Sequence, residues 1–271
     1  MAHFKDKVAL VTGGSSGLGK ATVERLASKG VIIYVVDLQI PSQEDGGDIY
    51  GDASIKYRKV DVTREDDVAN VISEIRYKQG RLDFLINCAG ILGHVQPVYD
   101  FHTDQMHSTQ MFEDIMRINV YGTFNVIRHA VGLMSTNPPD EDGQRGVIVN
   151  VSSVARSDGQ VGLLAYSASK GAISSMTVPL AREFGPVGIR VLAIAPAAIC
   201  TPMLDNEEYK WALAGHPSSA VFPKRVGRPE EFAHMVEFII ENHLVNATTM
   251  RLDGGFRNFP GSARSDDGTV Q

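Results

Sequence analysis

The sequence predicts an α/β protein built on a doubly wound parallel sheet of about seven strands with helices on both faces, a Rossmann-type fold. Short β-branched apolar runs alternate with longer helix-compatible segments along most of the chain, a glycine-rich turn follows the first apolar run, and Asp37 ends the second. Strands that are buried on both faces of a parallel sheet have this nearly continuous apolar character. Ligands bind such folds at the carboxyl ends of the strands, so we expect the site there.

The apolar runs and the segments between them give the order of the elements. We expect strands at residues 8–12, 31–37, 56–60, 82–87, 147–152 and 190–195. We expect helices at residues 17–28, 64–77, 111–134 and 165–184. Each helical segment is long enough to return over the sheet to the next parallel strand, which a right-handed crossover requires.

Composition and charge limit the class of protein. The 271 residues contain no repeat and no linker rich in Gly, Ser or Pro, so we expect one domain spanning residues 1–271. The net charge is −6 and no basic run occurs, so direct nucleic-acid binding is not expected. No apolar run approaches the roughly 20 residues that span a bilayer. Cys88 and Cys200 form no disulfide framework and suggest a reducing compartment.

Three long polar or mixed stretches interrupt the alternation, at residues 39–55, 93–110 and 201–225. The third follows an expected strand, so we expect it to cover the substrate. Its Trp211, Leu213 and Phe222 form either an apolar lid or ordinary loop packing. The tail at residues 257–271 is expected to be partly flexible.

The glycine-rich turn after the first strand is suited to a pyrophosphate. Glycine lets the backbone turn sharply and approach a ligand closely, and the N-terminus of the following helix offers free N–H groups. A tight strand–helix connection without a ligand is the alternative for this turn alone. The expected binding residues of the turn are Gly13, Ser15, Ser16, Gly17, Leu18 and Gly19.

Acidic residues at the ends of the next two strands indicate where an adenosine binds. Asp37 can accept hydrogen bonds from a ribose 2′-hydroxyl and would repel a 2′-phosphate. No Arg or Lys follows at Leu38 or Gln39, which favours NAD over NADP. Asp61 and Val62 are expected to border the adenine, although an Asp at this place can also cap a helix.

Tyr166 and Lys170 are spaced i, i+4 at the start of an expected helix, so both side chains lie on one face. A nearby ammonium favours the ionised form of a phenol, and we expect Lys170 to lower the pKa of Tyr166. Such a pair alone is common by chance. Ser153 at the end of another strand and Asn119 on the preceding helix make the combination specific.

The order of these residues resembles the short-chain dehydrogenase/reductase family over nearly the whole chain. The family's cofactor loop corresponds to residues 13–19 and its Asn-Ala-Gly turn to residues 87–90. Its catalytic tetrad corresponds to Asn119, Ser153, Tyr166 and Lys170. One departure is Pro196-Ala197, where the family has Pro-Gly, which can reshape the turn beside the nicotinamide.

The resemblance implies reversible hydride transfer between a secondary alcohol and NAD. Tyr166 would be the general base in oxidation and would contact both the cofactor and the substrate, and Lys170 would hold the nicotinamide ribose. Ser153 would stabilise the substrate oxygen, and Asn119 would hold a water linked to Lys170. The remaining cofactor contacts would come from Asn87, Cys88, Ala89, Gly90, Pro196, Ile199 and Thr201.

A closer resemblance is to one subgroup, the type-2 3-hydroxyacyl-CoA dehydrogenases, in the segments at residues 87–91, 122–128, 143–148, 159–162, 165–171 and 251–254. It implies interconversion of an (S)-3-hydroxyacyl-CoA and a 3-oxoacyl-CoA, a homotetramer, and the mitochondrial matrix in a eukaryote or the cytoplasm otherwise. Two alternatives are a related dehydrogenase for a hydroxysteroid, sugar or simple secondary alcohol, and a scaffold subunit of an RNA-processing complex. The complete tetrad argues against a pure scaffold.

Several remaining polar residues concern the substrate or a metal. Gln160, between the serine and the tyrosine, is expected to contact the substrate or to stabilise its own loop. Three histidines in residues 93–110 match no common zinc spacing, so we expect no metal. Coenzyme A is anionic, so a basic patch must offset the acidic chain, and Lys224 and Arg225 are the candidates.

Overall fold

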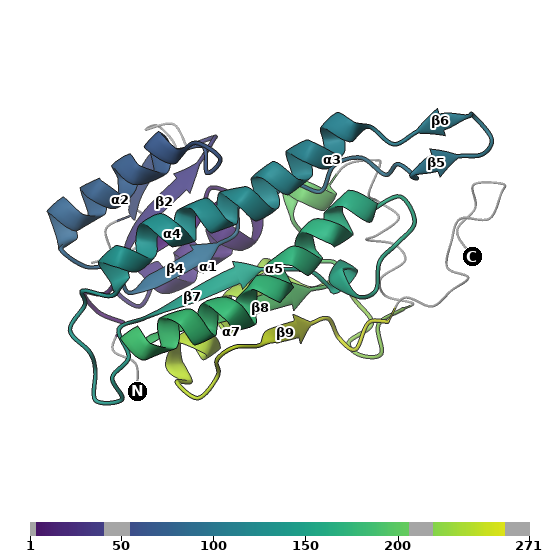
Figure 1. Cartoon of the computed structure of the whole chain (residues 1–271). Helices are drawn as coiled ribbons and strands as arrows, with labels where there is room; N and C mark the ends of the chain where they lie inside the picture. The colour runs from purple at the N-terminus through teal and green to yellow at the C-terminus, as the bar shows by residue number, and fades with distance from the viewer. Residues whose placement is uncertain (1–3, 41–54, 206–218, 258–271) are drawn as a thin grey trace.

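Seven parallel strands form one sheet in the computed structural model, which describes residues 4–40, 55–205 and 219–257 (Figure 1). Their order across the sheet is β3-β2-β1-β4-β7-β8-β9. The strands are β1 (Val8–Thr12), β2 (Ile32–Asp37), β3 (Ile55–Lys59), β4 (Phe84–Asn87), β7 (Gly146–Val151), β8 (Ile189–Pro196) and β9 (Thr249–Leu252). The order reverses direction at β1, which places a ligand-binding crevice at the carboxyl ends of β1 and β4.

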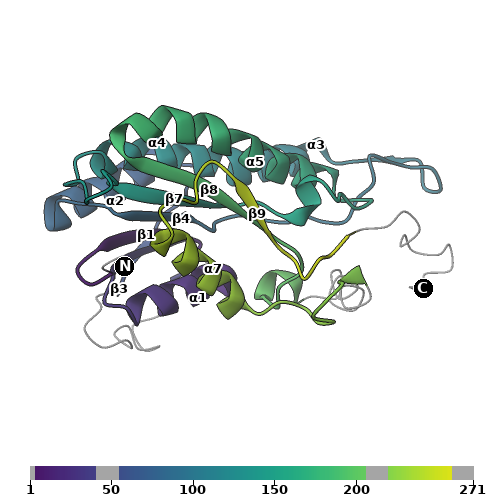
Figure 2. The ribbon, with the colours of Figure 1, turned by 90° about the horizontal axis from the view of Figure 1, so that it is seen from below.

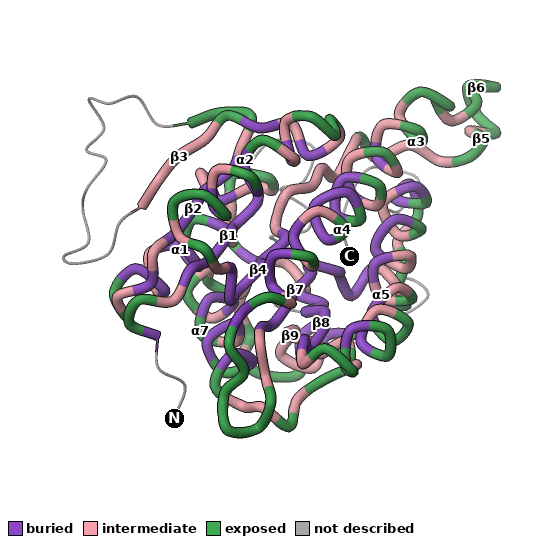
Figure 3. The backbone as a smooth tube through the Cα atoms, turned by 60° about the vertical axis from the view of Figure 1, so that its left-hand side comes forward, coloured by how far each residue is buried: buried purple, intermediate pink, exposed green. Residues whose placement is uncertain are grey.

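Helices cover both faces of the sheet (Figure 2). On one face lie α1 (Gly17–Ala27) and α7 (Pro229–Glu241), and on the other lie α2 (Glu65–Gln79), α4 (Thr123–Met134) and α5 (Leu164–Phe184). Each face has its own apolar core, and the tube drawing shows both as a buried interior behind exposed outer helix surfaces (Figure 3). The doubly wound Rossmann-type fold expected from the sequence is confirmed.

The expected strands all form, and each boundary lies within two residues of its expected place. One expected property is wrong: β3 is half-exposed rather than buried on both faces, because it forms the edge of the sheet. The strand β9 and the helix α7 were not among the expected elements. Leu252 at the end of β9 is only partly buried, and β9 has too few apolar residues to be detected by its pattern.

The expected helix at residues 111–134 is interrupted. It consists of α3 (Thr109–Ile115), a π-helical segment (Met116–Gly122) and α4 in direct succession. A π-helical turn shifts the register of the side chains that follow it, and such turns occur often at functional sites. Asn119 lies within this segment and is buried. Apolar periodicity does not reveal this change because the whole stretch from Thr109 to Met134 remains helical.

The stretch at residues 93–110 is not a plain loop, because it contains a two-stranded antiparallel hairpin of β5 (Tyr99–Asp100) and β6 (Gln105–Met106). The hairpin projects beyond α3 (Figure 1). Most of residues 39–55, residues 206–218 of the expected substrate-covering loop with Trp211 and Leu213, and residues 258–271 of the tail lie outside the described residues. Among the described helices, none has the length and apolar character to cross a membrane.

We predict that Phe232→Ala lowers the free energy of unfolding by about 3–5 kcal/mol, because this α7 side chain is fully buried in the core that α1 and α7 form with the sheet, and its removal leaves a cavity. Tyr77→Ala is the matched control: the Tyr77 side chain is 89% exposed, and its loss changes the free energy of unfolding by less than about 0.5 kcal/mol. Denaturant unfolding followed by circular dichroism measures both, and equal effects of the two substitutions would contradict the assignment of this core.

Candidate active site

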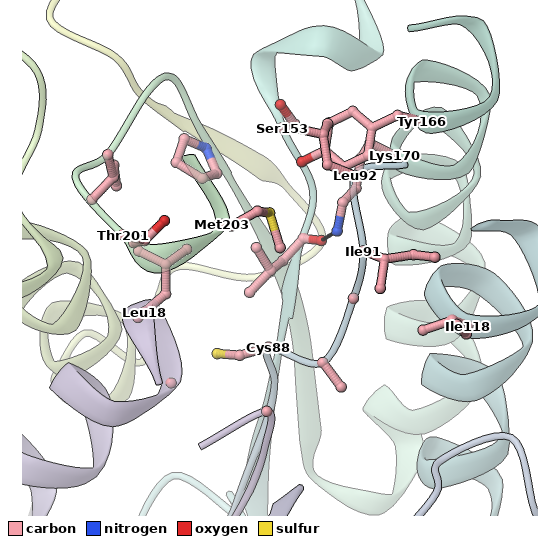
Figure 4. A pocket seen from close by; sticks show the side chains of 18 of the residues that line it. Leu18, Cys88, Ile91, Leu92, Ile118, Ser153, Tyr166, Lys170, Thr201 and Met203 are labelled. Carbon is pink, nitrogen blue, oxygen red and sulfur yellow. Dashed lines mark hydrogen bonds between the residues drawn. The ribbon is translucent and has the colours of Figure 1, made fainter. Parts of the chain in front are cut away.

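One cavity of about 800 Å³ lies along the carboxyl edge of the sheet. The loops after β1, β2, β4, β7 and β8 all contribute to its lining. Figure 4 shows Ser153, Tyr166 and Lys170 in one part of it and Leu18 and Cys88 in another. The cavity therefore connects the glycine-rich turn with the polar residues of α5.

The glycine-rich turn is shaped by positions that exclude a side chain. Gly13 has a φ of +64°, and a Cβ there would lie 2.7 Å from the backbone nitrogen of Ala89. A Cβ on Gly19 would collide with the carbonyl oxygen of Gly13. The turn is joined to the end of β4 by the hydrogen bond from the Ala89 N–H to Thr12 Oγ1, 3.1 Å long. These close approaches require glycine at both positions, and the turn leads directly into the N-terminus of α1 beside the cavity.

Asp37 and Ser15 form a polar corner beside this turn. The Ser15 N–H donates to Asp37 Oδ2 at 3.2 Å, so the carboxylate is fixed at the end of β2. The Ser15 hydroxyl is buried and makes no hydrogen bond to a described residue. A buried hydroxyl without a partner is costly unless a ligand satisfies it. The close glycine turn and the half-buried Asp37 carboxylate line the cavity and fit a dinucleotide bound here, whereas Ser15 is not among the lining residues.

Ser153, Tyr166 and Lys170 meet at the other part of the cavity (Figure 4). Ser153 follows β7, and its Oγ accepts a hydrogen bond from the Ala155 N–H at 3.1 Å. Lys170 Nζ donates to the Val151 carbonyl at 2.8 Å and lies 5.6 Å from the centroid of the Tyr166 ring. One strand end and one helix turn thus bring together a hydroxyl, a phenol and an amine.

The two titratable groups have shifted pKa values. Burial raises the pKa of Tyr166 to about 12, although the Ser153 hydroxyl acts in the opposite direction. Burial lowers the pKa of Lys170 to about 8. The expected lowering of the Tyr166 pKa is therefore wrong for this structure, because desolvation outweighs the hydrogen bond with Ser153. At neutral pH the phenol is protonated.

Asn119 does not line the cavity but stands directly behind it. Its Oδ1 accepts from the Ile91 N–H at 2.8 Å, and its Nδ2 donates to the Ile91 carbonyl at 2.9 Å and to Ser169 Oγ at 3.0 Å. Its side chain joins the segment after β4 to α5, so it fixes the position of Ile91 relative to the helix that carries Tyr166. Gly90 accommodates this arrangement, since a Cβ there would lie 3.0 Å from Asn119 Oδ1.

Most residues singled out in the sequence line the cavity, including Asp61, Val62, Gln160, Pro196, Ile199 and Thr201. Asn87 does not, because its Nδ2 donates to Asn150 Oδ1 within the sheet. The Asp61 carboxylate accepts from the N–H and hydroxyl of Thr63 and so also shapes its own turn. Lining residues that the sequence reasoning missed include Leu92, Arg117, Ile118 and Phe256. Of these, only Ile118 could have been predicted from the sequence, because it is next to the predicted site residue Asn119.

The expected basic patch at residues 224 and 225 is wrong. The Arg225 guanidinium donates to both carboxylate oxygens of Glu231, at 2.6 and 2.8 Å, so its charge is already paired. Lys224 Nζ donates to the Ala220 carbonyl. Neither side chain lines the cavity, because the turn at residues 222–227 directs both toward α7 and the loop itself.

Comparison with known proteins identifies the class. The family model of the short chain dehydrogenases matches residues 7–211. The chain is 45% identical to the 3-hydroxyacyl-CoA dehydrogenase type-2 of Drosophila melanogaster, over 95% of this chain and 100% of that one. It is 44% identical to the human protein of the same name, over 94% and 97%. The chain therefore belongs to the short chain dehydrogenase family and is an oxidoreductase.

A solved structure supports the same conclusion. The crystal structure of 3-hydroxyacyl-CoA dehydrogenase type-2 from Mycobacterium avium matches with a TM-score of 0.85 at 33% identity, covering 96% of this chain and 100% of that one. Dehydrogenases of this family typically use a nicotinamide cofactor, and the cavity described above fits one.

We predict that Gly13→Ala lowers the free energy of unfolding by about 1–3 kcal/mol, because an L-residue at this positive φ is strained and its Cβ would overlap Ala89. The same substitution weakens nicotinamide dinucleotide binding, measured by calorimetry. Gly132→Ala in α4 is the control, since a Cβ there meets nothing within 4 Å, and it raises the free energy of unfolding by up to about 1 kcal/mol. Unchanged dinucleotide affinity in Gly13→Ala would contradict the assigned turn.

Proposed function

We propose that the protein is an NAD-dependent dehydrogenase that interconverts an (S)-3-hydroxyacyl-CoA and a 3-oxoacyl-CoA. The supporting observation is that one cavity, of about 800 Å³, is lined both by the glycine-rich turn with Asp37 and by Ser153 with Tyr166. Its size is within the range of small-molecule and cofactor sites. A nicotinamide cofactor and a substrate could therefore lie next to each other inside it.

We place the cofactor at the carboxyl ends of β1 and β2, beside the point at which the strand order of the sheet reverses. The N-terminus of α1 with Ser15 and Gly17 would hold the pyrophosphate, and Asp37 would hold the adenosine ribose. Asp37 is followed by Leu38 and Gln39, neither of them basic, so a 2′-phosphate would meet a carboxylate without a compensating cation. This favours NAD. When bound, the cofactor supplies or takes up the hydride at the carbinol carbon.

The proton is handled by Tyr166. In the reduction of a ketone, its phenol donates a proton to the forming alkoxide, and in the oxidation of an alcohol its phenolate accepts one. The Ser153 hydroxyl donates a hydrogen bond to the same substrate oxygen and stabilises its developing charge. Lys170, held by the Val151 carbonyl, places its ammonium beside the phenol and favours the phenolate when it forms. Asn119 positions the helix that carries both residues.

The substrate half rests on the relatives. Proteins 44–45% identical over nearly the whole chain are named 3-hydroxyacyl-CoA dehydrogenase type-2. Gln160 lines the substrate part of the cavity and can donate to a thioester oxygen. The homotetramer stays a prediction of the family resemblance that light scattering tests. Residence in the mitochondrial matrix of a eukaryote also stays a prediction, and cell fractionation tests it.

A comparison of substrates tests the proposed function. Turnover with NADH and acetoacetyl-CoA is expected to exceed turnover of a keto-steroid or a short ketone, in kcat/KM, by at least about tenfold. Tyr166→Phe should lower kcat for the preferred substrate by at least about 100-fold while leaving the NAD dissociation constant within about twofold, since only the proton donor is removed. Preference for another ketone would overturn the acyl-CoA assignment, and full turnover by Tyr166→Phe would overturn the catalytic one.

The direction of the reaction should depend on pH because burial raises the pKa of Tyr166 to about 12. The phenolate fraction grows about tenfold per pH unit below that value, so kcat/KM for alcohol oxidation rises steadily from about pH 6 to 9. Ketone reduction needs the protonated phenol, so the ionisation of Tyr166 does not lower the rate of reduction over the same pH range. Initial rates in both directions measure this, and oxidation independent of pH would contradict the assignment of Tyr166 as the base.

A further inference from the structure

The loop between Ser153 and α5 forms one wall of the substrate part of the cavity. Asp158, Gln160 and Leu163 of this loop line the cavity, and so does Phe256, about 90 residues later in the chain. The loop has little regular structure beyond one turn of 3₁₀ helix (Val154–Arg156). The 3₁₀ turn packs against α5 and β8, and two polar contacts reach the residues that follow it.

The first contact is an ion pair between the loop and β9, the strand at the edge of the sheet beside β8 (Figure 1). Arg251 Nη2 donates to Asp158 Oδ2 at 2.6 Å, and its Nη1 donates to Ser157 Oγ at 3.3 Å. The side chains of Arg251 and Asp158 are only 21% and 14% exposed, so solvent screens the pair weakly. Burial alone would raise the pKa of Asp158, but the Arg251 guanidinium outweighs burial and holds it below its ordinary value.

The same guanidinium also binds the turn that carries Phe256. Arg251 Nε donates to Asp253 Oδ2 at 2.6 Å, and Nη2 donates to the Phe256 carbonyl at 2.8 Å. Asp253 in turn accepts from the Gly255 N–H at 3.0 Å. One planar group with several donors in a fixed geometry thus joins the loop to the facing wall, which a lysine cannot do with a single ammonium.

The second contact fixes the far end of the loop. The Gln96 N–H donates to the Gly162 carbonyl at 3.0 Å, and Gly162 has a φ of +84°. The segment leading to the hairpin β5–β6 therefore holds the loop at Gly162, four residues beyond the residue that Arg251 binds. Because Gly162 is held in this way, the ion pair between Arg251 and Asp158 fixes the other end of the segment that contains Gln160.

We propose that Arg251 is a positioning residue for the substrate: it fixes the distance between the loop of Gln160 and the wall of Phe256 and so sets the width of the cavity for the acyl group. The inference deepens the proposed function and rests on it. Arg251 reaches no part of the cofactor turn. Its effect should therefore appear in substrate affinity and not in cofactor affinity.

The test compares Arg251→Gln with Arg257→Gln. Arg257 donates to the same Asp253 carboxylate and the same Phe256 carbonyl and is more exposed. Among the described residues it acts on Asp158 only through its charge, without the hydrogen bond that Arg251 makes. Arg251→Gln is expected to raise KM for acetoacetyl-CoA at least about tenfold and to change kcat and the NAD dissociation constant by less than about threefold, whereas Arg257→Gln leaves all three within about twofold. Arg251→Lys should recover only part of the loss.

A double-mutant cycle and hydrogen exchange complete the test. Asp158→Asn is expected to raise KM as Arg251→Gln does, and the double variant should be no worse than either, because both remove one contact. Hydrogen exchange at residues 154–163 should accelerate in Arg251→Gln and not in Arg257→Gln. Unchanged KM, equal effects of both arginine substitutions, or unchanged exchange would overturn the proposal.

The substrate panel separates this proposal from the proposed function. If the wild-type enzyme turns over a different ketone in place of acetoacetyl-CoA, the acyl-CoA assignment fails, and the KM comparison is carried out with that ketone. If no ketone in the panel is turned over, the exchange experiment still decides whether Arg251 holds the loop. An effect on exchange without any effect on KM would show that Arg251 is structural only and would overturn the positioning role.

Discussion

The parallel pairing of β1, β4, β7 and β8 is the constraint on which the candidate site depends. Parallel strands end at one edge of a sheet, so the turns that follow them come together although they are far apart in the sequence. Thr12 binds the turn after β4, Val151 holds Lys170, and the end of β8 leads to Thr201 at the cavity. A slip in register of one strand would move these groups to the opposite face or out of reach.

Burial shifts the pKa values of the two titratable groups beside Ser153 in opposite directions. It favours the neutral phenol of Tyr166 and the neutral amine of Lys170, so the charged pair that supports oxidation is disfavoured in this structure and the proton donor for reduction is favoured. Hydrogen bonds fix the position of both groups without reversing this effect: Lys170 is held by Val151, and the helix is held by Asn119 through Ser169. The arrangement is rigid and shielded, which suits the stabilisation of a developing alkoxide.

The sequence predicts the fold well because the strands are buried and strongly apolar, as β1 and β7 show. It also predicts the glycine turn and Tyr166 with Lys170, since their chemistry depends on local spacing. It misses the π-helical turn at Asn119 and the hairpin β5–β6, because neither alters the apolar pattern strongly. The half-exposure of β3 could have been expected, because Lys56, Arg58 and Lys59 interrupt its apolar pattern. It misses Phe256 and the role of Arg251 because both act together with a loop about 90 residues earlier in the chain. It assigns Arg225 to the wrong partner because the ion pair with Glu231 is visible only in the folded chain.

Isotope transfer tests the central claim, that one cavity brings a nicotinamide cofactor and a ketone together beside Tyr166. NADH deuterated at both C4 positions is incubated in ordinary water with the enzyme and acetoacetyl-CoA, and the product is analysed by mass spectrometry. The account predicts one deuterium on the new carbinol carbon, because the hydride comes directly from the cofactor, while the hydroxyl proton comes from solvent through Tyr166. A product alcohol without deuterium, or the absence of any reduced product with acyl-CoA, steroid or simple ketones, would contradict it.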